Sequence, residues 1–183
     1  MRLTRGRKMD KKEFAAFAMA LKTYYPKEDL LPNEQALGLW FLQLQDLDFK
    51  LAETALCKWV AVNKWSPSIA DIRAEAAAIR FGDLPDWGEG WEQVIKAIAK
   101  YGMYRPQEAL ESMDKITKLC VERLGFINLC LSENIAADRA NFRNIYEAYR
   151  ERQKIENQIP LATKERIGYM QNAMIELKGG GNG

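Results

Sequence analysis

Histidine is absent from this chain of 183 residues, and cysteine occurs only three times. The missing histidine removes the commonest general base and the commonest metal ligand. Cys57, Cys120 and Cys130 are odd in number and far apart, and no two of them have the spacing of a zinc site. All three fall in helical patterns, so we expect free, partly buried thiols of a reducing compartment.

Motifs for nucleotide and metal chemistry are also missing. The sequence has no Gly-x-x-x-x-Gly-Lys-Ser/Thr phosphate loop, and no strand precedes Gly88 and Gly90 to make them a dinucleotide fingerprint. Asp46 and Asp48 are acidic neighbours, but their flanks are typical of a turn and a helix cap rather than of a metal site. We therefore predict no enzymatic activity, no catalytic residues, no cofactor and no bound metal.

Long apolar segments are absent as well. No run approaches the roughly 18 residues of a membrane span, and the N-terminus lacks the apolar core of a secretory signal. The sequence therefore predicts a protein with no membrane partner.

Positive charge is concentrated at the N-terminus. The net charge is +2, and residues 1–12 contain six Lys/Arg and one Asp. Residues 13–83 hold seven basic and ten acidic side chains, so the body of the chain is near neutral to acidic. This distribution predicts weak DNA binding that depends on residues 1–12. Translation from Met9 would remove most of this tail, and the sequence leaves open whether Met1–Lys8 is native.

The spacing of apolar residues predicts helix almost throughout. Caps and breakers set the expected limits, such as Asp10 with Glu13 at one start and Gly102 at one end. The expected helices cover residues 10–24, 32–44, 49–62, 68–80, 91–101, 106–113, 114–124, 126–131, 134–157 and 163–177. The predicted fold class is all-α, with an N-terminal four-helix bundle followed by a second helical region that contains a long amphipathic helix.

Gly82 and Pro85 interrupt the helical pattern and give the clearest boundary. The predicted divisions are a basic tail over 1–9, an N-terminal helical domain over 10–81, a linker over 82–86, a second helical region over 87–159, a C-terminal helix over 160–178 and a flexible tail over 179–183.

Several motifs in residues 10–80 carry a resemblance to a known family. They include Leu21-Lys22-Thr23-Tyr24-Tyr25-Pro26, Asp46-Leu47 and the corner Trp65-Ser66-Pro67-Ser68-Ile69-Ala70-Asp71-Ile72-Arg73. In this order and spacing they resemble the phage replicative helicase loaders and inhibitors. Residues 84–155 look like a second helical region found in longer relatives.

The resemblance implies a phage DNA replication protein in the host bacterial cytoplasm. Such a protein binds a hexameric replicative helicase, inhibits it and delivers it to origin DNA marked by a phage origin-binding replisome organiser. It has no ATPase of its own and contacts DNA only indirectly or weakly. A loader without chemistry must act by binding different helicase states with different affinities.

The last predicted helix is the best candidate for the helicase contact, because the family resemblance implies a C-terminal contact segment. The predicted contact residues are Arg166, Ile167, Met170, Met174 and Leu177. The four apolar members lie at i, i+3, i+7 and i+10, and such a methionine-rich face can lie in a partner's groove. Packing of this face on the protein's own domain is an equal alternative.

Aromatic and basic residues give further expectations. Trp87 and Trp91 flank two glycines beside the boundary, where a second partner contact and burial are equally compatible with the sequence. We expect Trp40, Trp59 and Trp65 in the core, and Tyr24-Tyr25 as a packed helix end. The long helix carries Arg139, Arg143, Arg150 and Arg152 between acidic residues, which favours a salt-linked solvated surface.

Another function class remains open. A replication-initiation protein could bind origin DNA through the helix-turn-helix-like corner at Trp65–Arg73. The helix after this corner is short and rich in alanine, and only Arg73 and Arg80 are basic, so phosphate neutralisation would be weak. A purely structural phage protein is a third class that the sequence does not exclude.

Overall fold

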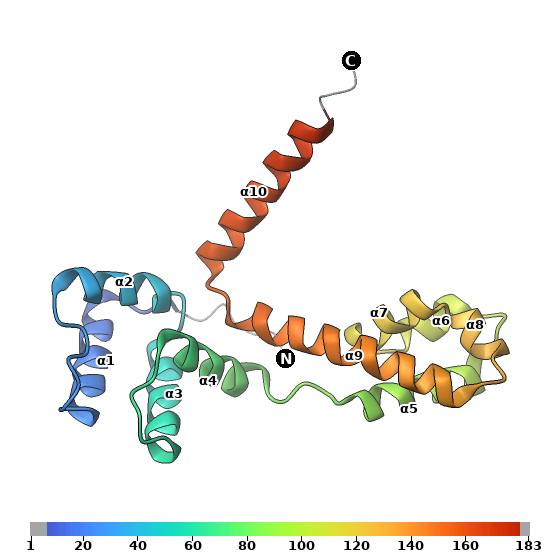
Figure 1. Ribbon diagram of the computed structural model, residues 1–183, viewed down its shortest axis with the longest axis horizontal. Helices are drawn as coiled ribbons and strands as arrows, with labels where there is room; N and C mark the ends of the chain where they lie inside the picture. The colour runs from blue at the N-terminus through green and yellow to red at the C-terminus, as the bar shows by residue number, and fades with distance from the viewer. Residues whose placement is uncertain (1–6, 180–183) are drawn as a thin grey trace. The chain divides into compact units, whose positions relative to one another are not determined.

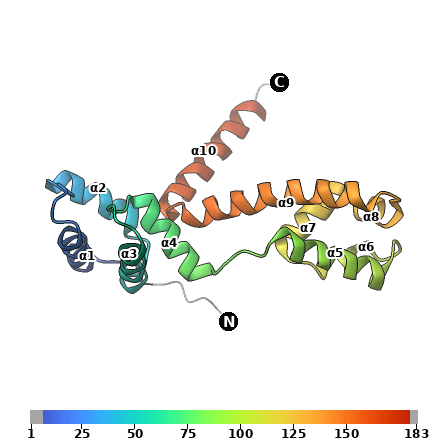
Figure 2. The same ribbon diagram turned by 60° about the horizontal axis from the view of Figure 1, so that its bottom comes forward.

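The computed structural model describes the backbone of residues 7–179 and the side chains of residues 7–175. Within that range the chain forms ten α-helices and no strand, which confirms the predicted all-α class (Figures 1 and 2). The helices are α1 (Lys11–Tyr24), α2 (Glu34–Leu44), α3 (Phe49–Val62), α4 (Ile69–Phe81), α5 (Trp87–Tyr101), α6 (Pro106–Glu111), α7 (Lys115–Leu124), α8 (Phe126–Leu131), α9 (Ile135–Gln158) and α10 (Leu161–Gly179).

Two compact units divide the chain. The first contains residues 1–82 together with 157–183, and the second contains residues 83–156. The second unit is therefore inserted, in sequence, between two segments of the first. Residues 82–86 form no helix and connect α4 to α5.

The first unit has a core built from α1–α4. In this bundle α3 packs on α1 and α4, and α2 packs on α1 and α4. The predicted starts of three helices are confirmed, since Asp10, Asp48 and Ser68 accept hydrogen bonds from first-turn amides of α1, α3 and α4. Large core side chains with very little exposed surface include Phe14, Phe17, Leu21, Leu44, Leu56 and Ile72.

The second unit has a core of its own, whose largest fully buried side chains come from α5, α7 and α9. Phe142 and Tyr146 of α9 are fully buried, and the Phe142 ring lies 5.3 Å from that of Trp91 on α5. Gly90 lets α5 pack closely against Tyr146 of α9, because a Cβ added at this glycine would lie 2.5 Å from Cε2 of Tyr146. Burial raises the pKa of Tyr146 and of Cys120 to about 12, so both groups stay protonated at neutral pH.

Several helix limits differ from the prediction, each for a local reason. Helix α5 begins at Trp87 rather than Trp91, because Asp86 and Glu89 form a reciprocal capping box. Helix α10 begins at Leu161, directly after Pro160, so Thr163 is inside the helix and does not cap it. Helix α2 begins at Glu34 with Asn33 as its cap, and α6 ends two residues early, at Glu111.

Three expectations of burial were wrong. Trp65 is 78% exposed, because α3 ends at Val62 and helical spacing no longer governs the side chains after it. At the end of α1, Tyr25 is buried as expected but Tyr24 is exposed. Cys57 is exposed, whereas Cys120 is buried and Cys130 is half-buried.

Candidate functional site

Helix α10 carries the predicted contact residues on an exposed surface. The side chains of Arg166, Ile167, Met170 and Met174 are exposed, and the three apolar ones belong to neither core. Met170 and Met174 are 51% and 60% exposed. The side chain of Leu177 lies outside the described residues. The part of the stripe that the structure describes is therefore not packed on the protein itself.

The apolar surface of α10 is wider than the predicted stripe. Tyr169 and Ile175 are 77% and 67% exposed and lie at other angles around the helix. Sequence reasoning missed them because it searched for one face at 3–4 spacing. An isolated helix exposing this much apolar surface in several directions is characteristic of a segment that packs against another surface.

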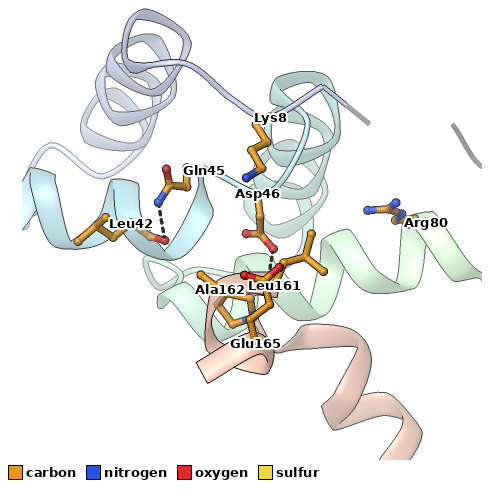
Figure 3. A pocket seen from close by; sticks show the side chains of 9 residues that line it. Lys8, Leu42, Gln45, Asp46, Arg80, Leu161, Ala162 and Glu165 are labelled. Carbon is orange, nitrogen blue, oxygen red and sulfur yellow. Dashed lines mark hydrogen bonds between the residues drawn. The ribbon is translucent and has the colours of Figure 1, made fainter. Parts of the chain in front are cut away.

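The base of α10 is attached to the N-terminal bundle through a single turn. The backbone N–H of Leu161 donates a hydrogen bond of 3.1 Å to Oδ2 of Asp46, in the turn between α2 and α3 (Figure 3). Around this bond is a pocket lined by Leu42 and Gln45 of the α2 end, by Arg80 of α4 and by the first residues of α10. In Figure 3 the side chain of Lys8 points toward Asp46 from above.

Asp46 is held in turn by Arg73 of α4. Nη1 and Nη2 of Arg73 donate to the two carboxylate oxygens of Asp46 at 2.7 and 3.0 Å. Nη1 also donates to the carbonyl of Gln43 at 2.6 Å, and Nε donates to the carbonyl of Gln158 at the end of α9. Little of either charged side chain is exposed, 6% of that of Arg73 and 12% of that of Asp46.

The electrostatics of this pair favour its charged form. Burial acts to raise the pKa of Asp46, but hydrogen bonds and charge from Arg73, together with the Leu161 amide, outweigh it and lower that pKa below its ordinary value. A fork of guanidinium donors matched to two carboxylate oxygens is the strongest form of such a pair. The sequence singled out Asp46 as part of a turn beside Asp48, and Arg73 as a basic residue of the corner, and both as parts of family motifs, but nothing in their spacing pointed to their contact.

Trp87 and Trp91 are half-buried and pack against the core of the second unit. The guanidinium carbons of Arg139 and Arg143 lie 5.0 and 5.2 Å from the centroid of the Trp87 ring. A role for these tryptophans in partner binding stays a prediction, but much of their surface is used within the unit.

The predicted salt-linked character of α9 is confirmed at Arg143, whose Nε lies 2.8 Å from Oε1 of Glu147. Arg150 instead donates to the carbonyl of Leu84 at 3.1 Å, and Arg152 lies over the ring of Tyr149. These arginines therefore have partners within the second unit.

In the corner between α3 and α4, Trp65 is exposed and Arg73 is buried. Trp65 projects into solvent while its carbonyl accepts a 2.9 Å hydrogen bond from Nε1 of Trp59. Arg73, one of the two arginines that a DNA-binding corner would use, is directed into the bundle. Of the two, only Arg80 is exposed, which weakens the DNA-binding alternative.

Neither a metal-binding cluster nor a membrane-spanning helix occurs among the described residues. No group of three or more His, Cys, Asp or Glu side chains there could hold a metal ion. Within the same residues, no helix combines the length and the apolar composition needed to cross a membrane.

Comparison with protein families gives a match over most of the N-terminal bundle. Residues 9–73 match the family described as the N-terminal domain of the phage helicase loader/inhibitor gp39P. We call this matched segment, residues 9–73, the loader N-terminal domain. The expected family of phage helicase loaders and inhibitors is thereby confirmed over this part of the chain. No curated protein and no solved structure matches the chain in the corresponding comparisons.

The matched residues of this loader N-terminal domain begin just before α1 and end inside α4. It begins at Met9, whose side chain is buried and whose backbone nitrogen lies 3.0 Å from the carbonyl oxygens of both Gln45 and Leu47. It ends at Arg73, the residue that contacts Gln158. The domain therefore contains both members of the Arg73–Asp46 pair, and α10 lies outside it.

Proposed function

We propose that this protein binds a hexameric replicative helicase, holds it inactive and delivers it to phage origin DNA without hydrolysing nucleotide itself. The observation that carries the proposal is the match of residues 9–73 to the N-terminal domain of the phage helicase loader/inhibitor family. The mechanism is differential binding, in which the protein favours a helicase state that does not unwind DNA. A phage origin-binding replisome organiser, or DNA itself, then releases the helicase by coupling to that equilibrium.

The proposed helicase contact is α10. Its support is the exposure of Ile167, Met170 and Met174 outside both cores. Burying each such side chain against a partner contributes roughly 1.5–3 kcal/mol before the cost of ordering is subtracted. Arg166 beside this stripe suits an acidic rim on the helicase, where opposite charge speeds encounter more than it strengthens the complex.

Co-purification with the host and phage hexameric helicases, with and without ATP, tests this function. We expect the full chain to retain at least one helicase. The double substitution Met170→Asp and Met174→Asp should abolish binding and leave the helical circular dichroism and the melting temperature nearly unchanged, because neither side chain is part of a core.

The matched control is Gln171→Asp with Asn172→Asp, which adds the same charge at two exposed polar positions of the same helix. Binding by the control but not by the methionine variant supports the α10 contact. Binding by both moves the contact elsewhere. A collapse of the melting temperature in the methionine variant would show that α10 packs on its own domain.

A further inference from the structure

We propose that Arg73 and Asp46 form a docking site on the N-terminal bundle for the chain segment from Gln158 to Leu161, and that this site positions the base of α10. The proposal rests on the contacts of these four residues, all within the first unit. Its significance for helicase binding rests additionally on the proposed function of α10.

The two charges are matched to the two helix ends that meet there. The last carbonyls of a helix and the first amides of the next have no partner within their own helices. Arg73 donates to the Gln158 carbonyl at the C-terminal end of α9, and Asp46 accepts from the Leu161 amide at the N-terminal end of α10. A cation at a helix C-terminus and an anion at a helix N-terminus are each stabilised by the helix dipole.

Asp46 supplies a cap that the sequence around α10 does not. Residue 160, directly before the helix, is a proline, whose side chain has no hydrogen-bonding atom, and its carbonyl accepts the first helical bond, from Lys164 at 3.0 Å. The carboxylate that normally precedes a helix is here provided by a turn more than a hundred residues earlier. The start of α10 is therefore fixed by tertiary contact and not by local sequence.

The rest of the segment also lies on the bundle. Asn157, Ile159, Leu161 and Lys164 line one pocket together with Ala76, Ala77, Arg80 and Phe81 of α4. This contact continues the docking site along α4 beyond Arg73. In sequence, the second unit begins after Gly82 and ends before Asn157. The docking site therefore holds the segment that follows the insertion against α4, the helix that precedes it.

Arg73 and Asp46 are thus positioning residues for α10. A helix held at its base presents its apolar stripe in a restricted set of directions, which lowers the ordering cost of binding. The same helix on a free tether would offer the same side chains with a larger entropic cost. The proposal predicts that the docking site and the stripe can be impaired separately.

Hydrogen exchange of the full chain, measured without helicase, tests the docking site directly. Leu161→Pro removes the amide that Asp46 binds, and proline is favoured at the first position of a helix, so α10 itself is not disrupted. Leu161→Ala removes the same leucine side chain but keeps the amide. We expect amides 164–167 to exchange about tenfold faster in the proline variant than in the alanine variant, with no change in α1.

Arg73→Met provides the second arm, with Lys58→Met as its control. Lys58 forms a 2.7 Å ion pair with Glu75 between α3 and α4 and is itself half exposed. We expect Arg73→Met, but not Lys58→Met, to speed the exchange of amides 161 and 164–167. Equal exchange in the proline and alanine variants, or slower exchange in the proline variant, would overturn the docking site even if Arg73→Met proves too unstable to measure.

Helicase affinity separates this inference from the function on which it rests. We expect Leu161→Pro to bind helicase about fivefold more weakly than Leu161→Ala, while both retain some binding. Faster exchange with unchanged affinity would overturn the positioning role. If the unaltered chain binds no helicase, the proposed function fails, and the exchange measurements still decide whether the docking site exists.

Discussion

The carboxylate of Asp46 lies between the guanidinium of Arg73, at 2.7 and 3.0 Å, and the first amide of α10, at 3.1 Å. A buried charge is tolerated only when its hydrogen-bonding capacity is filled, and here donors from two distant segments fill it. The stability of the first unit therefore depends on the ionisation of one carboxylate.

This dependence predicts an acid-sensitive contribution to stability. Because the pKa of Asp46 is lower in the folded protein than in the unfolded chain, its stabilisation is complete above the unfolded value of about 3.9 and is lost as pH falls through the folded value. Asp46→Asn should lower the free energy of unfolding by about 3 kcal/mol at pH 7. Denaturant unfolding at pH 7 and at pH 3 should show this difference shrinking.

Asp10 also has a lowered pKa, chiefly from its backbone hydrogen bond with Glu13. The unaltered protein and the Asp46→Asn variant therefore both keep some acid sensitivity. The informative quantity is therefore the difference between them at each pH. A difference that is the same at pH 7 and pH 3 would mean that the charge of Asp46 contributes nothing to folding.

Local sequence signals predicted the helices well but did not predict contacts between distant segments. Capping patterns at Asp10, Asp48, Ser68 and Asp114 located four helix starts, because a cap and its amides are within a few residues of each other. Asp46 and Arg73 meet across 27 residues, and Arg73 and Gln158 across 85. The spacing of apolar residues gives no information on such a contact. The sequence therefore did not predict that Asp46 and Arg73 hold the base of α10.

The error at Trp65 has a different origin. A tryptophan close to a buried helical face was expected to follow that face, but the chain had already left the helix at Asn63. The candidate stripe on α10 was predictable as a helical pattern. Its exposure was not, because an apolar face of this kind packs internally in most proteins and the sequence does not state what covers it.

The different environments of two tryptophans predict different costs of removing them. Trp65→Ala should change the free energy of unfolding by less than about 0.5 kcal/mol, because the side chain is 78% exposed. Trp59→Ala should cost about 3 kcal/mol, since Trp59 packs against the first core and its indole N–H binds the Trp65 carbonyl. Denaturant unfolding followed by circular dichroism measures both. Similar costs for the two variants would contradict the position of Trp65.

Two glycines predict opposite effects of adding one methyl group. Gly90→Ala would place Cβ 2.5 Å from Tyr146 and 2.9 Å from Thr117, inside the core of the second unit. We expect a net loss of about 1–3 kcal/mol, even though alanine favours the helix. Gly38→Ala in α2 meets nothing within 4 Å and should stabilise by up to about 1 kcal/mol. Thermal unfolding compares them, and a Gly90→Ala protein as stable as the unaltered one would contradict the close packing of α5 and α9.

The last prediction concerns DNA binding, because this property distinguishes a helicase loader from an origin-binding protein that uses the corner at Trp65–Arg73. Binding to duplex DNA should be weak and should depend on the basic N-terminal tail. Residues 1–6 of this tail lie outside the described residues, and Arg7 already contacts Asp10 and Glu13 at 3.3 and 3.1 Å. Removing residues 1–8 deletes four Lys/Arg, which should reduce the slope of log affinity against log salt by roughly 3.

Arg80→Ala is the matched test of the corner, because Arg80 is the exposed arginine that follows it and Arg73 is buried. If the tail carries the binding, this change leaves the affinity and the salt slope of the full chain unaltered. Titration of a fluorescent duplex at several salt concentrations gives both quantities. A protein that starts at Met9, still binds duplex tightly at physiological salt and loses that binding with Arg80→Ala would favour an origin-binding protein over a helicase loader.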